Sequence, residues 1–136
     1  MKSKNPIITS KYTADPAPMV YGDTLYLYTS HDEDELINDF YTMFDWHCFS
    51  TKDMVNWTDH GKVFSLDDIT WAEDRAWAPQ AVERNGKFYL YCPVHKKDGG
   101  MAIAVGVSDS PTGPFRDLGY PLLDEGDWND IDPTVY

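Results

Sequence analysis

The chain has 136 residues, enough for one modest domain with its own core but short for two. Acidic residues outnumber basic ones by 23 to 11, and the net charge of −12 repels phosphate backbones and anionic membranes, so nucleic-acid and membrane partners are not expected. Aromatic residues make up 15% of the chain, a surplus that either a ligand-binding cleft or a β-rich fold would use.

Short alternating apolar runs, separated by turn residues, predict four strands in the first half of the chain. They are expected to begin at about Met19, Thr24, Thr42 and Asn56. Gly22-Asp23 between the first two runs predicts a hairpin turn. The acidic run 31–35 lacks the alternating ligands and the glycine of a calcium loop, so it is interpreted as a solvated loop.

The same series starts again in the second half. The run 77–82 leads to Asn85-Gly86, and the apolar run 87–91 follows. Asn-Gly between apolar runs is a strong hairpin signal, and Gly99-Gly100 predicts a second hairpin turn.

The two halves form a repeat. Tyr26-Leu27-Tyr28 falls on Tyr89-Leu90-Tyr91. Further along, the difference in residue number between matching positions is slightly smaller: Phe49-Ser50 is aligned with Val107-Ser108, and Trp57 with Phe115. The turn between these two matches has the same length in both halves. A four-stranded unit that recurs at such a spacing is typical of a β-propeller blade. A closed propeller needs at least about four blades, so either this chain is part of a longer protein, which we expect, or the ring closes with other chains.

Two Asp-Pro motifs, Asp15-Pro16 and Asp132-Pro133, open equivalent units of this repeat. A residue before proline favours an extended conformation, so each aspartate is expected at the start of a strand. Around a propeller axis both carboxylates would point into one central space, which is the arrangement that glycoside hydrolysis needs. The alternative is that Asp-Pro merely marks the turn before a strand.

The chain resembles the N-terminal part of family 43 of the glycoside hydrolases, the five-bladed β-propellers that include β-xylosidases and α-L-arabinofuranosidases. The resemblance covers essentially the whole chain and rests on Asn5-Pro6-Ile7, Ala14-Asp15-Pro16, the turn from Ser50 to Trp57, Trp77-Ala78-Pro79 and Ile131-Asp132-Pro133. It implies an all-β propeller in which 1–70 form the first blade, 71–126 the second and 127–136 the start of the third. It also implies inverting hydrolysis of O-glycosidic bonds in arabinose- or xylose-containing plant cell-wall oligosaccharides, with the remaining blades supplied by the rest of the parent chain.

Four residues are candidates for the site, and the resemblance assigns roles to three of them, Asp15, Asp132 and Trp77. Asp15 falls on the general base, and Asp132 on the residue that orients the general acid and tunes its pKa. The acid is a Glu from a later blade, and no residue of this chain matches it. Trp77 lines the substrate pocket in the family, although inter-blade packing would also explain it. His31, expected on a loop, either hydrogen-bonds a sugar hydroxyl or is a solvated loop residue.

No cofactor is expected, since the His and Cys residues show no zinc spacing and the chain has no phosphate loop. The resemblance is compatible with a structural calcium ion, for which no ligands are identified. Cys48 and Cys92 lie in strand-like runs and are expected to be buried free thiols, and without an apolar signal segment a cytoplasmic location is expected. The alternative function is a non-catalytic carbohydrate-binding propeller, or an inactive fragment lacking the acid.

Overall fold

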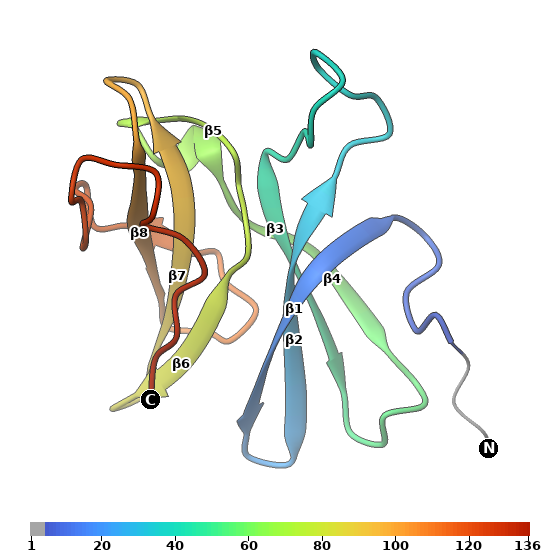
Figure 1. The fold of residues 1–136 in the computed structure, drawn as a ribbon. Coiled ribbons are helices and arrows are strands. Elements are labelled where there is room, and N and C mark those ends of the chain that lie inside the picture. Colours follow the sequence, from blue (N-terminus) through green and yellow to red (C-terminus); the bar gives the residue numbers. More distant parts are fainter. Residues whose placement is uncertain (1–4) are drawn as a thin grey trace.

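A computed structural model describes residues 5–136, most of which belong to two antiparallel sheets (Figure 1). The first sheet has four strands in chain order: β1 (Tyr12–Tyr21), β2 (Thr24–Asp32), β3 (Asp45–Thr51) and β4 (Thr58–Ser65). A short 3₁₀ turn, η1 (Leu66–Asp68), leads to the second sheet. None of the helical segments described is long and apolar enough to cross a membrane. The predicted all-β class is confirmed.

The second sheet contains β5 (Ala72–Asp74), β6 (Gln80–Arg84), β7 (Lys87–Lys96), β8 (Met101–Ser108) and β9 (Arg116–Asp117). Both β5 and β6 pair with the same edge of β7, β5 near its C-terminal end and β6 near its N-terminal end. β5 and β6 therefore form one edge of the sheet, and residues 75–79 lie between them, so the sheet is four strands wide, like the first. The short strand β5 was not predicted.

The predicted hairpin turns are confirmed. Tyr21 pairs with Thr24 around Gly22-Asp23, and Arg84 pairs with Lys87 around Asn85-Gly86. Asn85 and Gly86 have φ of 55° and 75°, the two positive values of a type I′ turn. This turn matches the right-handed twist of the strands that it connects.

The pairing registers establish the repeat and correct its alignment. Pro18 pairs with Leu27, and at the predicted offset Ala81 pairs with Leu90, so the first two strands repeat as expected. On the third strand, however, Leu27 faces Phe49 and Leu90 faces Gly106. The predicted match of Phe49 to Val107 is thus wrong by one residue, and the turn that follows is one residue longer in the second sheet.

Packing explains why the smallest residue occupies the position equivalent to Phe49. A Cβ on Gly106 would lie 2.9 Å from Cβ of Phe115 and 3.1 Å from the ring of Phe64 in the first sheet. A side chain there would push the two sheets apart. An alignment that pairs bulky apolar residues slips here, and a slip of one residue exchanges the faces of a strand.

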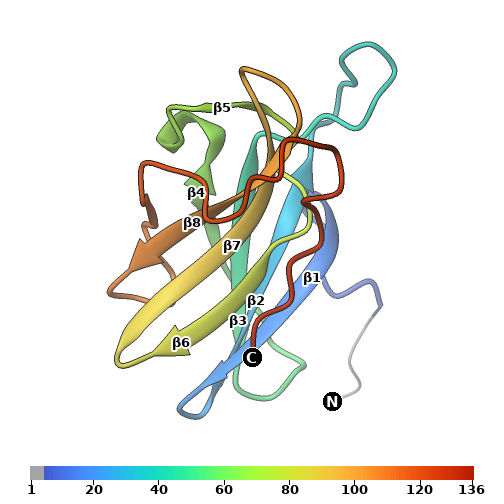
Figure 2. The ribbon, with the colours of Figure 1, turned by 60° about the vertical axis from the view of Figure 1, so that its left-hand side comes forward.

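The core lies between the two sheets, which face each other in Figures 1 and 2. Trp46 is fully buried there, and its Nε1–H donates to the carbonyl oxygen of Trp77 at 2.7 Å. The hydroxyl of Tyr28 donates to the carbonyl oxygen of Pro111 at 2.5 Å, and the amide of Phe115 donates to the carbonyl of Val63. The sheets are thus joined by hydrogen bonds as well as by apolar packing. Trp46 is a core residue.

Both cysteines are buried and free, as predicted. Burial raises the pKa of the Cys48 thiol to about 12 and raises that of Cys92 as well. Because the thiolate is the reactive form, neither side chain is a candidate nucleophile.

Candidate active site

Asp15 lies inside β1, at a β-bulge between Ala14 and Ala17. Its φ is 51°, in the left-handed region, so the predicted extended conformation at the start of a strand is wrong. A bulge inserts a residue that departs from the strand geometry, and aspartate tolerates the left-handed region better than most residues. The carboxylate is exposed, and the hydroxyl of Ser30 on β2 donates to its Oδ2 at 3.3 Å. The bulge therefore turns a carboxylate out of the sheet into solvent.

Asp132 has the same backbone conformation, with φ of 51°. It is exposed and lies outside the named strands, in the C-terminal segment that runs alongside β6 (Figures 1 and 2). The predicted extended conformation is wrong for this residue too. The shared left-handed geometry is independent support for treating the two Asp-Pro motifs as equivalent. Their catalytic roles stay predictions.

Asp32 is a third carboxylate close to Asp15, and the sequence reasoning missed it by placing it in a solvated acidic loop. It is the last residue of β2 and pairs with Tyr12. Burial, and secondly the negative charge of Asp15, raise the pKa of the half-buried Asp32. Because alternate residues of a strand share a face, Asp32 lies on the same face as Ser30, the partner of Asp15. Counting every second residue along the strand from Ser30 would have identified Asp32 as a residue on this face.

Asp32→Asn is expected to stabilise the full-length protein at pH 7, by less than about 1 kcal/mol. Because folding raises its pKa, ionised Asp32 opposes folding; the penalty is absent below the unfolded pKa of about 3.9 and is complete above the folded value. Melting temperatures of the variant and the wild type at pH 7 and pH 4 test this. The gain should shrink at pH 4, and the exposed neighbour Asp34→Asn serves as the control. A lower melting temperature at pH 7 would contradict the expectation.

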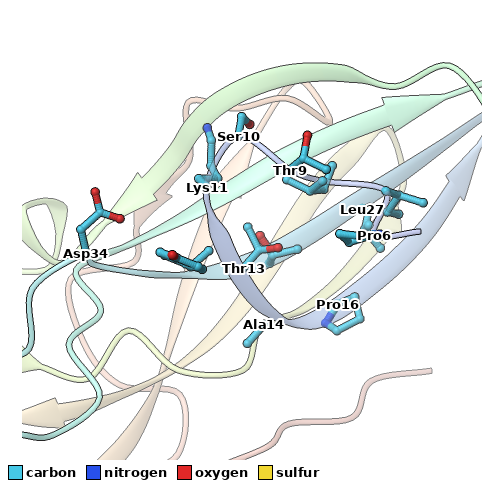
Figure 3. Close-up of a pocket in the computed structure, with 13 residues that line it drawn as sticks. Pro6, Thr9, Ser10, Lys11, Thr13, Ala14, Pro16, Leu27 and Asp34 are labelled. Atoms are coloured by element: carbon cyan, nitrogen blue, oxygen red, sulfur yellow. The ribbon is translucent and has the colours of Figure 1, made fainter. Parts of the chain in front are cut away.

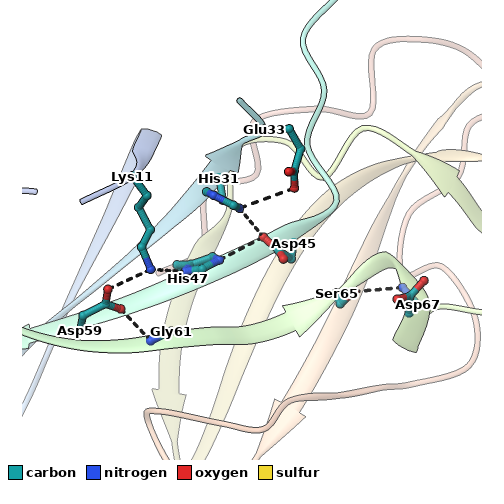
Figure 4. Close-up of polar contacts among 9 residues, drawn as sticks. All are labelled: Lys11, His31, Glu33, Asp45, His47, Asp59, Gly61, Ser65 and Asp67. Carbon is teal, nitrogen blue, oxygen red and sulfur yellow. Dashed lines mark hydrogen bonds and ion pairs between the residues drawn. The ribbon is translucent and has the colours of Figure 1, made fainter. Parts of the chain in front are cut away.

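His31 lies within β2, not on a loop, and its ring belongs to a hydrogen-bonded network on the other face of the first sheet (Figure 4). Its Nδ1 is 2.9 Å from Oδ1 of Asp45, which is also 3.1 Å from Nε2 of His47. Burial alone would raise the pKa of Asp45, but hydrogen bonds from His47 and His31 outweigh it and lower that pKa. The structure therefore places His31 and Asp15 on opposite faces, and a contact of His31 with substrate stays a prediction.

Lys11, at the other end of this network, determines which ring nitrogen of His47 carries a proton. Nζ of Lys11 lies 3.1 Å from Nδ1 of His47 and 2.9 Å from Oδ2 of Asp59. An ammonium group only donates, so Nδ1 of His47 accepts and Nε2 carries the proton that it donates to Asp45. The network is a chain of alternating donors and acceptors between two carboxylates.

His31, Asp45 and His47 are also the one compact group of metal-ligating side chains within residues 5–136. Calcium prefers six to eight oxygen ligands, and this group offers two imidazoles and one carboxylate. A metal on Nε2 of His47 would leave a proton on Nδ1, facing the ammonium of Lys11. The donor set does not fit a calcium ion, and the protonation pattern does not fit a metal-bound His47.

Trp77 is half-buried in the segment between β5 and β6, at the edge of the second sheet. Its amide donates to the carbonyl of Pro93 on β7, and its carbonyl accepts from the indole of Trp46. These two bonds fix the backbone while the ring packs at the border of the core. The ring of Phe40, from the loop between β2 and β3, lies 6.4 Å away between centroids. The predicted role of Trp77 as a sugar platform requires this partly exposed position.

Two hollows flank β1. A pocket of about 710 Å³ lies on the sheet face that carries Leu27 and Thr29, lined on its other side by the segment 6–14 (Figure 3). A second hollow, of about 580 Å³, opens between the start of β1 and the loop after β2, and it is lined by Tyr12, Thr13, Asp32, Glu33, Leu36, Asp39, Phe40 and Tyr41. This second hollow contains Asp32, the neighbour of Asp15. Aromatic rings and carboxylates around one opening suit the apolar faces and hydroxyl groups of a sugar.

Comparison with known proteins identifies the class of protein to which this geometry belongs. The sequence profile of glycosyl hydrolases family 43 matches residues 3–136. The chain is 42% identical over 139 residues to xylosidase/arabinosidase 43A of Humicola insolens, which covers 96% of this chain and 42% of that protein. It is 36% identical over 145 residues to a xylosidase/arabinosidase of Bacteroides ovatus, covering 98% of this chain and 45% of that one.

A solved structure shows the same fold. The β-xylosidase/α-arabinofuranosidase from a compost microbial metagenome, in complex with xylotriose, superimposes with a TM-score of 0.82 at 38% identity. The match covers 93% of this chain and 40% of that one. The chain thus spans less than half the length of these relatives.

Proposed function

Because the chain belongs to the family 43 glycosyl hydrolases, we propose that its full-length protein hydrolyses O-glycosidic bonds in arabinose- or xylose-containing plant cell-wall oligosaccharides. The names of its relatives, xylosidase and arabinosidase, support this substrate class. The observation that carries the proposal is the pair of exposed aspartates, Asp15 and Asp132, in the same left-handed conformation within equivalent Asp-Pro motifs.

The reaction proceeds with inversion. Asp15 is the general base: its exposed carboxylate accepts a proton from a water molecule as that water attacks the anomeric carbon. The hydroxyl of Ser30 donates to Oδ2 of this carboxylate at 3.3 Å and helps to orient it. Asp132 holds the general acid, a Glu from outside this chain, in its protonated form through like-charge repulsion, and the acid then protonates the leaving oxygen.

The complete enzyme is a five-bladed propeller in which these two sheets are the first two blades. The outer face of the first sheet supports this arrangement, because it carries a large pocket and the buried hydroxyl of Thr29, which has no hydrogen-bond partner among residues 5–136. Further chain packed on this face would cover both. The oligosaccharide and these additional blades are the partners of the chain.

The stereochemical course tests the proposal. The full-length enzyme should release from a nitrophenyl β-xyloside, or from an α-L-arabinofuranoside, a sugar of the opposite anomeric configuration, because water attacks directly from the face opposite the leaving group. Proton NMR in the first minutes, before mutarotation, distinguishes the two anomers. The matched control is a nitrophenyl glucoside, which should be cleaved much more slowly. Release of the retained anomer would overturn the assignment of Asp15 as a base, and binding without cleavage of either pentoside would favour a carbohydrate-binding propeller.

A further inference from the structure

Three aromatic rings from three separate segments surround the guanidinium of Arg75. The guanidinium carbon is 5.4 Å from the ring centroid of Phe40, on the loop after β2. It is 5.9 Å from the ring centroid of Trp77, which lies in the same segment as Arg75. It is 5.3 Å from the ring centroid of Trp128, in the C-terminal segment. All three distances are within the range of cation–π attraction, and a planar guanidinium also stacks on such rings. Arg75 is thus the point at which the three segments meet.

A second set of contacts connects this junction to β7. Oδ1 of Asp74 lies 2.5 Å from NH1 of Arg75 and 3.0 Å from Nδ1 of His95. The His95 ring stacks on Trp128, with centroids 4.9 Å apart and an interplanar angle of 16°. Trp128 is therefore in contact with both Arg75 and His95, while 55% of its surface remains exposed.

Trp128 belongs to the segment that leads to Asp132, and that segment is attached to the second sheet step by step. Leu123 bridges to Ile103 on β8, and the carbonyl of Asp127 accepts from the amide of Met101 at 2.7 Å. Oδ2 of the buried Asp130 accepts from the amide of Glu125. Trp128 lies shortly before Asp132 in the chain, within this attached segment.

We propose that Arg75 is a positioning residue for Asp132: through Trp128 it holds the segment that carries Asp132 against Phe40 and Trp77. This inference rests on the proposed function, because it assigns Arg75 a role in the same reaction. Arg75 acts on the general acid only through Asp132. Its φ of 62°, in the left-handed region, shows that the backbone also departs from strand geometry at the point where this side chain leaves the sheet.

The test compares Arg75→Met and Asp132→Asn in the full-length enzyme on two substrates, a nitrophenyl glycoside and a natural oligosaccharide. Arg75→Met should lower kcat on the oligosaccharide by about ten- to a hundredfold, as expected for a catalytic group displaced by about 1 Å. Its effect on the nitrophenyl substrate should be several-fold smaller, because a good leaving group needs less help from the acid. The basic limb of its pH–rate profile should move to lower pH, as in Asp132→Asn. Arg84→Met, at the last residue of β6 and next to the turn to β7, is the matched control and should change neither the rates nor the pH profile.

Two further measurements separate positioning from a general structural role. Arg75→Lys keeps the charge but not the planar stacking, so it should restore only part of the activity. In the double variant Arg75→Met/Asp132→Asn, the loss should not exceed that of Asp132→Asn alone, because both changes act through one carboxylate. A higher KM with unchanged kcat in Arg75→Met would overturn the inference and indicate direct sugar binding. Equal losses on both substrates with an unchanged pH profile would overturn it as well.

The indole NMR resonance of Trp128, assigned with Trp128→Phe, keeps the inference distinct from the proposed function. It should shift in Arg75→Met and stay in place in Arg84→Met. An unmoved resonance would refute the positioning role whatever Asp132 does. A shifted resonance, with no leaving-group dependence in Asp132→Asn, would support the contact while refuting the proposed role of Asp132.

Discussion

Asp15→Asn is expected to remove nearly all turnover of the full-length enzyme on every substrate, however good its leaving group. In the proposed mechanism Asp15 is the base that removes a proton from water in the chemical step, a contribution of about a hundred- to ten-thousandfold. Asparagine is the suitable replacement because it tolerates the left-handed φ of 51° at this position, so the backbone of the bulge should be unchanged. Initial rates on a nitrophenyl glycoside and on a natural oligosaccharide measure the loss.

Two comparisons show that the loss is chemical. Asp23→Asn, in the hairpin turn at the far end of β1, should retain wild-type rates. Asp15→Gly, which also accepts a positive φ, should regain activity on the nitrophenyl substrate when azide is added, because azide attacks without losing a proton. Substantial activity in Asp15→Asn without azide would show that another group is the base.

Asp132→Asn is expected to act selectively, because in the proposed mechanism Asp132 works through the general acid. Poor leaving groups should suffer most, since they depend on a protonated acid. The sign of the pH effect follows from charge: a neighbouring carboxylate raises the pKa of the acid, so its removal lowers that pKa and moves the basic limb of the pH–rate profile to lower pH. Asparagine again preserves the left-handed backbone.

The check on Asp132→Asn is the ratio of kcat/KM on the oligosaccharide to that on the nitrophenyl glycoside, across the pH range. This ratio should fall well below that of the wild type, and in Asp15→Asn it should change little. Equal losses on both substrates with the wild-type pH profile would refute the division of roles between the two aspartates. Asp130→Asn is not a suitable control, because the buried Asp130 accepts a backbone hydrogen bond in the same segment.

Much of the fold was predictable because local signals agreed with each other. Asn85-Gly86 has the two residues that a type I′ turn requires, and alternating apolar residues mark the strands on both sides of it. The repeat of β1 and β2 was found because Tyr26 and Tyr89 lie in matching strands. The alignment of the third strands was wrong at Gly106, because the sequence does not show that Phe64 and Phe115 take the space that a side chain there would occupy.

The candidate site was less predictable because its geometry depends on long-range contacts. Proline was expected to extend the residue before it, and the bulge in β1 overrides that preference at Asp15. From the sequence, Asp32 was interpreted as one of several loop carboxylates, and only the pairing of β1 with β2 shows that it shares a face with Ser30. The environment of Arg75 joins segments that are far apart in the sequence, and no local pattern marks it.

The hydrogen bonds that cross between the two sheets bear on how this protein can be recombined with its relatives. In many repeat proteins each unit adds its own stability and one interface, so single units can be exchanged. Here the hydroxyl of Tyr28 and the indole of Trp46, both fully buried, donate to the backbone carbonyls of Pro111, in the loop between β8 and β9, and of Trp77, in the segment between β5 and β6. Replacing either sheet alone would shift those carbonyls and leave buried donors without acceptors, at a cost of about 1–3 kcal/mol each. The smallest unit of this chain that a chimera can exchange is therefore the pair of sheets.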